Sequence, residues 1–245
     1  NDFEFRDSVR LAGVNSINWA RVLAQAVYYF SSAVALGAPA RQVSFTVPTG
    51  NFGDIFAGFI AKRMGLPIDK LIVATNQNDI LHRCLTQGAY KTSGVLPSIS
   101  PSMDIQVSSN FERLLFEAYG RDGAAVSGLM AALKAEGGFS LSQGVLEMLQ
   151  RDFQSGRCSE EQTRAQIEQT LKGSGELLCP HSAIGVHVAE QQIQPETPMI
   201  TLATAHPAKF PDAVQSATGL RPDLPPHMAD LLERPERIAR VANDL

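Results

Sequence analysis

The stretch Val43-Ser-Phe-Thr-Val-Pro-Thr-Gly-Asn-Phe-Gly-Asp54 decides the fold of this chain. It begins as a β-rich run and turns at Pro48-Thr49-Gly50 into a helical pattern that reaches Met64. Such a loop suits an anion, because the helix start offers unpaired N–H groups and the positive end of its dipole. Two glycines allow close backbone approach, and Thr49 and Asn51 can add hydrogen bonds. The stretch predicts a phosphate site, although a tight turn alone would use the same residue types.

Composition excludes several classes of function. The chain has 245 residues, 44% of them hydrophobic, which is typical of one large globular domain or of one with a small appendage. A formal net charge of -4 argues against a nucleic-acid partner. No run approaches the roughly 18 apolar residues of a membrane span. Three cysteines without C-x-x-C spacing favour a reducing compartment, so we expect a cytoplasmic protein.

The order of strands and helices predicts a mostly parallel sheet. A second strand, 70–75, follows the first loop and helix, and it ends at Asn76-Gln-Asn-Asp79 before another helix. Strand, helix, strand and helix with short connections is typical of parallel sheets, whose ligands bind at the carboxyl ends of the strands. A buried strand candidate, 199–203, delivers Thr204 and His206 to such an end. We therefore expect an α/β fold.

Four parts follow from the pattern. We expect an α/β ligand-binding part, a helical insertion without visible chemistry, a return to the α/β core, and a peripheral tail rich in proline. Their ranges are 1–120, 121–175, 176–220 and 221–245.

A second anion site is predicted at the start of the helix 19–35. Asn18 or Ser16 can cap this helix, and Arg21 lies on its first turn, close to Asn15. A guanidinium beside amide and hydroxyl groups suits an anion, whereas a solvated arginine beside a routine cap is the alternative.

Other chemistries lack their motifs. The chain has no G-x-G-x-x-G and no G-x-x-x-x-G-K-[ST], which argues against the usual dinucleotide and nucleotide triphosphate sites. It also has no G-x-S-x-G and no H-E-x-x-H, which argues against a serine hydrolase and a zinc protease. His181 and His187 do not share a helical face, and we expect no metal. His181, in a Pro-His-Ser turn, is the better candidate for a role.

Several motifs together resemble threonine synthase, in its longer bacterial and fungal branch. They cover nearly the whole chain in the right order: Asn15-Ser-Ile-Asn-Trp-Ala-Arg21 with Leu23-Ala-Gln25 and Tyr28-Tyr-Phe30, Val47-Pro-Thr-Gly-Asn-Phe-Gly-Asp54, Ala74-Thr-Asn-Gln-Asn-Asp79, Met103-Asp-Ile105, Ser108-Ser-Asn-Phe-Glu-Arg113, Pro180-His-Ser-Ala183 and Thr204-Ala-His-Pro-Ala-Lys-Phe210. The resemblance implies a fold-type II enzyme dependent on pyridoxal phosphate, with a three-layer architecture like that of the tryptophan synthase β subunit: a mostly parallel, twisted sheet flanked by helices. It also implies conversion of O-phosphohomoserine and water to threonine and phosphate.

The resemblance assigns residues to both anion sites. The cofactor phosphate would be held by Thr49, Gly50, Asn51, Phe52, Gly53 and Asp54, with Thr204 near the pyridine nitrogen. The substrate phosphate would be held by Asn15, Ser16, Asn18 and Arg21. Further candidates are Asn76, Asn78, Asp79, His181 and His206.

Two departures from the family pattern matter. The family's Schiff-base lysine stands in a Phe-Lys-Asp segment that none of this chain's lysines matches, and Lys209 belongs to the C-terminal Ala-Lys-Phe motif. Cys179 stands where an acidic residue often precedes Pro-His. With no initiator Met at Asn1, we expect the C-terminal part of a longer enzyme, inactive alone and partnered by the missing N-terminal part, as a monomer or dimer. The alternatives are a non-catalytic phosphate-ligand-binding protein and a related pyridoxal-phosphate-dependent phospho-lyase.

Overall fold

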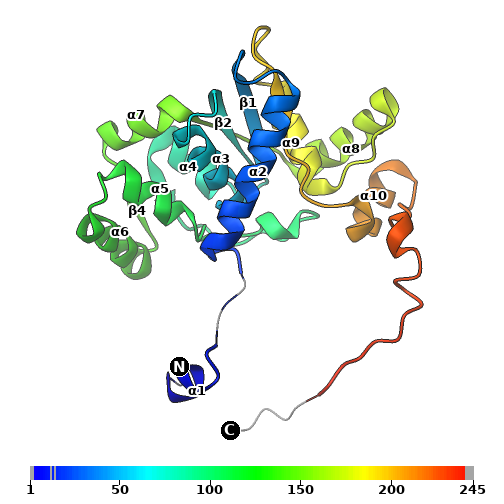
Figure 1. Cartoon of the computed structure of the whole chain (residues 1–245), viewed down its shortest axis with the longest axis horizontal. Coiled ribbons are helices and arrows are strands. Elements are labelled where there is room, and N and C mark those ends of the chain that lie inside the picture. The colour runs from blue at the N-terminus through cyan, green and yellow to red at the C-terminus, as the bar shows by residue number, and fades with distance from the viewer. Residues whose placement is uncertain (1–2, 12, 14, 241–245) are drawn as a thin grey trace.

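A four-stranded parallel sheet forms the centre of the molecule (Figure 1). The computed structural model describes residues 3–11, 13 and 15–240, so the remaining residues of the predicted first and last parts lie outside the description. The sheet has the order β5-β2-β1-β6, formed by β1 (Val43–Pro48), β2 (Ile68–Thr75), β5 (Phe153–Arg157) and β6 (Met199–Thr201). Every pair is parallel, which confirms the predicted α/β class.

Strand β1 forms the middle of this sheet because its side chains suit burial on both faces. All six of its residues are buried, and Phe45 lies in register with Leu71 of β2 on one side and Ile200 of β6 on the other. β6, which the sequence predicts as a buried strand, is instead a half-buried edge strand.

Helices cover both faces of the sheet and complete three layers. On one face lie α2 (Trp19–Ala35) and α3 (Gly53–Arg63), and the buried Tyr29 of α2 packs on Phe45 with ring centroids 4.7 Å apart. On the other face, Ile184 and Val188 of α9 (Pro180–Glu190) pack with Ile72 of β2. This arrangement confirms the layered architecture expected from the sequence.

The range 121–175, predicted as a helical insertion, contributes a strand to the central sheet. It contains α6 (Gly123–Glu136), β4 (Gly138–Ser140), α7 (Gln143–Asp152), β5 and α8 (Glu160–Ser174). Phe153 of β5 pairs with Leu71 of β2. The run Phe-Gln-Ser-Gly-Arg is short and polar, so only its pairing with β2 makes it a strand. Ser159 and Gln162 form a capping box at the start of α8.

Smaller elements complete the chain. They are α1 (Phe3–Ser8), α4 (Ile80–Gln87), β3 (Ala89–Lys91), the 3-10 turn η1 (Pro101–Met103), α5 (Phe111–Ala118), η2 (Pro207–Lys209), α10 (Pro211–Thr218) and η3 (Pro226–Met228). The segment carrying α1 and the C-terminal segment extend away from the body (Figure 1). Among the described residues, no helix has the length and apolarity that a bilayer crossing needs.

Candidate functional site

A cavity of about 570 Å³ opens at the carboxyl ends of β1 and β6. Parallel sheets place ligands at this edge, where the loops that leave the strands meet helix N-termini. The structure brings together in its wall most of the residues predicted for the two anion sites: Ser16, Arg21, Thr49, Gly50, Asn51, Phe52, Gly53, Asp54, His181 and Thr204.

The loop after β1 is shaped by Phe52. This residue has a φ of 64° at the N-cap of α3, a left-handed conformation that is unfavourable for a bulky side chain. Its buried ring packs against Phe111 and Phe153, with centroids 5.2 and 5.9 Å away, which holds the turn. The first hydrogen bond of α3 runs from the Phe56 N–H to the Phe52 carbonyl. The N–H groups of residues 53–55 therefore precede the helical ladder and can bind an anion.

The long loop before α5 braces this turn from one side. A Cβ atom on Gly50 would lie 2.4 Å from the carbonyl oxygen of Ser102, so the two loops touch through their backbones. The hydroxyl of Ser108 also donates to the carbonyl of Gly50 at 2.7 Å. Gly50 is therefore required for contact between two protein loops, in addition to any approach of a ligand.

Asn110 connects the two predicted anion regions. Asn110 immediately precedes α5, but its side chain makes no capping bond there. Its amide instead donates to the carbonyls of Ser16, at 2.9 Å, and of Asn51, at 3.0 Å. One buried amide thus ties the segment before α2 to the loop before α3.

Asp54 supplies a carboxyl group at the start of α3. The hydroxyl of Tyr29 donates to the Asp54 carbonyl at 2.9 Å and approaches its Oδ1 at 3.2 Å. Burial raises the pKa of Asp54 to about 6, against the lowering effect of the hydrogen bond from Tyr29. Burial, and then the neighbouring carboxylate, raise the pKa of Tyr29 well above its usual value. Tyr29 therefore stays a neutral donor.

Some polar side chains at the start of α2 and just before it make local hydrogen bonds, and others line the cavity. Asn18 caps α2 by accepting a hydrogen bond from the Ala20 N–H at 2.9 Å, and Asn15 accepts one from the Ile17 N–H at 3.1 Å. Neither asparagine lines the cavity, although Ser16 and Arg21 do. The Asn15 and Asn18 side-chain oxygens thus stabilise the chain turn that presents Arg21.

Two further residues of α2 line the cavity, although the sequence motifs that contain them did not lead us to assign them to a site. Gln25 and Tyr28 follow Arg21 at four and seven residues, so the three side chains share one face of the helix. The same spacing in the sequence could have identified them. They add an amide and a phenol to the arginine.

His181 lies across the cavity, at the start of α9. Its Nε2 accepts a hydrogen bond from the Ser102 N–H at 3.2 Å, which assigns the ring proton to Nδ1. Nδ1 is buried and has no partner among the described residues. Burial, and then the charge of Lys209, lower the pKa of His181 to about 4. The ring is therefore neutral at pH 7, and its N–H is a buried donor of the kind that normally has a hydrogen-bond acceptor.

Thr204 reaches the cavity from the loop after β6. Its N–H donates to the Ser182 hydroxyl at 3.2 Å, and its Oγ1 lies 3.9 Å from Sγ of Cys179. Cys179 caps α9, because its sulfur accepts from the Ser182 N–H at 3.4 Å. The thiol therefore caps a helix and helps to position Thr204, at the place where the family pattern often has an acidic residue.

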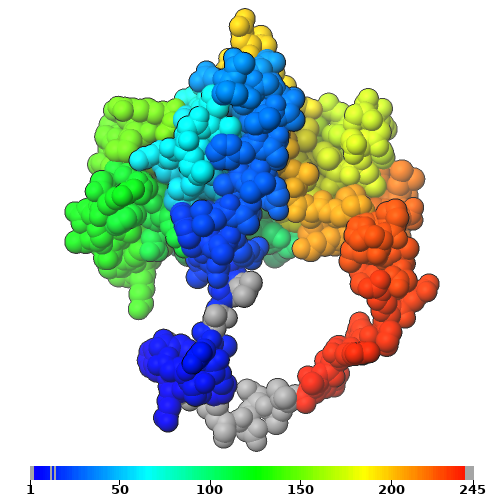
Figure 2. Space-filling view, in the orientation of Figure 1, coloured from blue at the N-terminus to red at the C-terminus, as the bar shows by residue number. Residues whose placement is uncertain are grey.

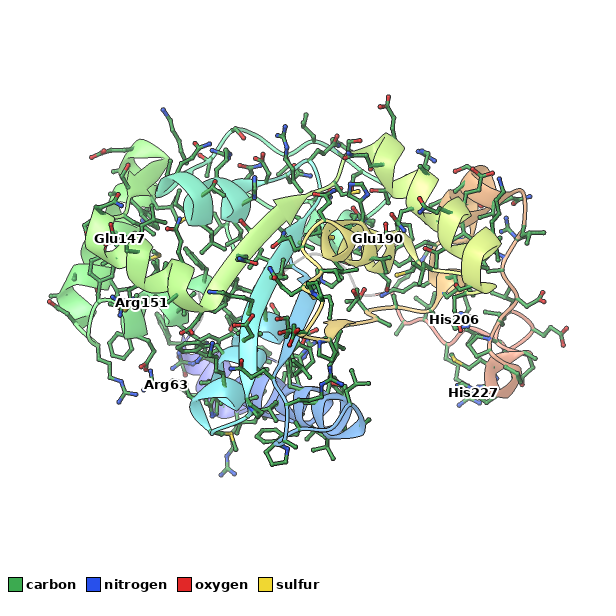
Figure 3. All side chains as sticks on the ribbon, turned by 90° about the horizontal axis from the view of Figure 1, so that it is seen from above. Arg63, Glu147, Arg151, Glu190, His206 and His227 are labelled. Atoms are coloured by element: carbon green, nitrogen blue, oxygen red, sulfur yellow. The ribbon has the colours of Figure 1, made fainter. Side chains whose placement is uncertain are left out.

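Four further candidates lie outside the cavity wall. The side chains of Asn76 and Asn78 donate to Oδ1 of Asp104 at 2.8 and 2.9 Å, and so they brace the loop around η1. Asp79 forms ion pairs with two arginines of α4 and β5. His206 caps η2 on the side of the molecule that carries the C-terminal segment (Figure 3). These side chains support the loops around the cavity from outside it.

The chain is similar to threonine synthases. Residues 182–245 match the family model described as threonine synthase, C-terminal. A threonine synthase from Pseudomonas aeruginosa is 54% identical, over all of this chain and 52% of its own length. A solved structure of threonine synthase with bound pyridoxal phosphate, from Brucella melitensis, is 61% identical at a TM-score of 0.94, covering 96% of this chain and 51% of its own.

A solved yeast threonine synthase is more distant. It is 41% identical at a TM-score of 0.82, covering 90% of this chain and 48% of its own. These matches identify the architecture as that of fold-type II pyridoxal-phosphate enzymes. This chain is therefore similar to the threonine synthases and spans about half of their length.

Proposed function

We propose that this chain is the C-terminal part of a threonine synthase, which converts O-phosphohomoserine and water to threonine and phosphate. The observation that carries the proposal is that the loop 49–54 and the face of α2 with Arg21 line one cavity. Two anion sites in one cavity fit a cofactor phosphate and a substrate phosphate. A cytoplasmic location is part of this proposal.

The residues present fit pyridoxal phosphate. Free N–H groups at the start of α3 suit its phosphate, and the hydroxyl of Thr204 can reach a ring nitrogen on the opposite wall. A cavity of about 570 Å³ is large enough for a cofactor together with a small amino acid. When bound, pyridoxal phosphate supplies an electron sink for charge that develops on the substrate. The loop and Thr204 would orient it, and neutral His181 would keep η1 in place through Ser102.

Arg21 is the residue that best fits the substrate phosphate. It lines the cavity, and within the described part of the chain no carboxylate pairs with it. An unpaired guanidinium can bind two phosphate oxygens at once, which favours a phosphate monoester over a neutral amino acid. Gln25 and Tyr28 can add hydrogen bonds beside it.

The N-terminal part of the same polypeptide is the proposed partner. An apolar stripe on α2 is exposed, with Trp19, Leu23, Val27 and Val34 between 43% and 62% accessible. Figure 2 shows α2 on the surface of the molecule, with nothing packed over it in that view. A helix normally buries such a stripe. Since the chain spans about half of its relatives, we infer that the other half covers this stripe and brings the Schiff-base lysine.

The test uses the full-length protein with Arg21→Ala. We expect KM for O-phosphohomoserine to rise at least about tenfold with little change in cofactor affinity, because one charge-assisted contact is lost. Arg151→Ala is the matched control, since Arg151 lies on α7 (Figure 3) and is not among the residues that line the cavity. An unchanged KM in Arg21→Ala would remove Arg21 from the site.

Turnover and product analysis of the unmodified full-length protein separate two alternatives. A protein that binds phosphate ligands without catalysis would turn over no substrate even at full length. A phospho-lyase would release a keto acid in place of threonine.

A further inference from the structure

Asp54 is the only carboxylate among the described residues that line the cavity. It stands at the second position of α3, inside the turn whose N–H groups are available to an anion. If the loop holds a phosphate group, as proposed above, a carboxylate and a phosphate share one helix start. Two like charges that close repel each other unless a proton or a cation lies between them.

No cation of the described chain neutralises Asp54. The charged and titratable groups that line the cavity with it are Arg21 and Tyr28 from α2, His181 from α9 and Lys209 from η2. None of them forms an ion pair or hydrogen bond with the Asp54 carboxyl, within the residues that the structure describes. Its side-chain partner is the neutral hydroxyl of Tyr29, which can donate one hydrogen bond and carries no charge.

We propose that the loop 49–54 binds a phosphate group together with one proton, which is held between the carboxyl of Asp54 and the anion. A protonated carboxyl becomes a hydrogen-bond donor, so Asp54 then contributes an attractive contact in place of repulsion. The proton is available near neutral pH, because burial already raises the pKa of this group to about 6 in the free chain. A phosphate dianion nearby raises it again.

The proposal fixes the pH dependence of binding. Above the pKa of the free carboxyl and below that of the bound form, each unit of pH removes a factor of about ten in affinity, because one proton is taken up per ligand. We expect this slope between pH 7 and pH 8. A site that binds the dianion alone shows no such loss in this range.

The test is calorimetry of pyridoxine 5'-phosphate binding to the full chain at pH 8, in two buffers with different ionisation enthalpies. This probe carries the phosphate ester but no aldehyde, so lysines do not react with it. The difference between buffers counts the protons taken up. We expect about one proton for the unmodified chain and about one fewer for Asp54→Asn. Asp212→Asn, an acid-to-amide change at an exposed side chain of α10, should behave as the unmodified chain does.

The outcomes separate this inference from the proposed function. Binding with no proton uptake by the unmodified chain, or equal uptake with Asp54→Asn, overturns the role of Asp54 and leaves the phosphate site standing. No binding in either buffer overturns the phosphate site and this inference with it. Tyr29→Phe provides a second variant: without its donor, the Asp54 pKa rises, and affinity at pH 8 should exceed that of the unmodified chain.

Discussion

Gly50→Ala is the substitution whose effect the geometry defines best. The added Cβ would lie 2.4 Å from the Ser102 carbonyl oxygen, which is about 1 Å closer than a normal contact between these atoms. The obstacle is backbone, and Ser102 is also held by His181, so no flexible side chain can move away. The backbone dihedrals of Gly50 are not in the positive-φ region, so the effect is steric. Overpacking of this kind costs about 1–3 kcal/mol.

The assay is thermal unfolding followed by circular dichroism. For a chain of this length, each kcal/mol lowers Tm by roughly 2–4 °C, so we expect a loss of roughly 2–12 °C. Gly128→Ala is the matched control, because a Cβ there meets nothing within 4 Å and the residue lies inside α6. It should stabilise the chain by about 0.5–1 kcal/mol. Equal melting temperatures for Gly50→Ala and the unmodified chain would refute the claim that the two loops are in backbone contact.

Three further predictions concern pH and the surface of α2. The lowered pKa of His181 means that the unfolded chain binds more protons than the folded chain between about pH 4 and 6.5, so the free energy of unfolding falls as the pH falls through this window. His181→Asn removes this contribution and should make the fall less steep. The raised pKa of Asp54 acts with the opposite sign, so the stabilisation from this carboxyl grows as the pH falls from about 6 toward 4, and Asp54→Asn should make the fall in stability steeper. Urea titrations at pH 4, 5.5 and 7 measure both effects. The same dependence of the unfolding free energy on pH in the unmodified chain and both variants would contradict both assignments. The double variant Leu23→Ser, Val27→Ser should change the stability of this chain by less than about 1 kcal/mol, since both side chains are exposed. The same variant should weaken the association of this chain with a separately expressed N-terminal part. Undiminished association in a pull-down experiment would exclude this stripe as the docking face.

Local patterns explain what the sequence predicts well. β1, β2 and the turn between Pro48 and Asp54 are encoded by neighbouring residues, and the cap at Asn18 needs only the start of α2. Gln25 and Tyr28 were within reach of the same reasoning, because helical spacing alone puts them beside Arg21.

Long-range pairing explains what the sequence does not predict. β5 becomes a strand only because β2 offers it an edge. Asn76 follows a strand as site residues often do, yet it binds Asp104, which lies 28 residues further along the chain. No local pattern distinguishes an asparagine that contacts a ligand from one that braces a loop. The buried carboxyl of Asp54 is a similar case, since its surroundings include Tyr29 from another helix.

The two bonds of the Asn110 amide have a consequence for anyone who wishes to redesign this site. Because one planar group binds the carbonyls of Ser16 and Asn51, these two carbonyls have a fixed separation. Lengthening the segment before α2 to admit a larger substrate would pull on the loop before α3 and disturb its own ligand. The two binding regions can therefore be altered independently only after residue 110 has been replaced by a side chain that releases one of them.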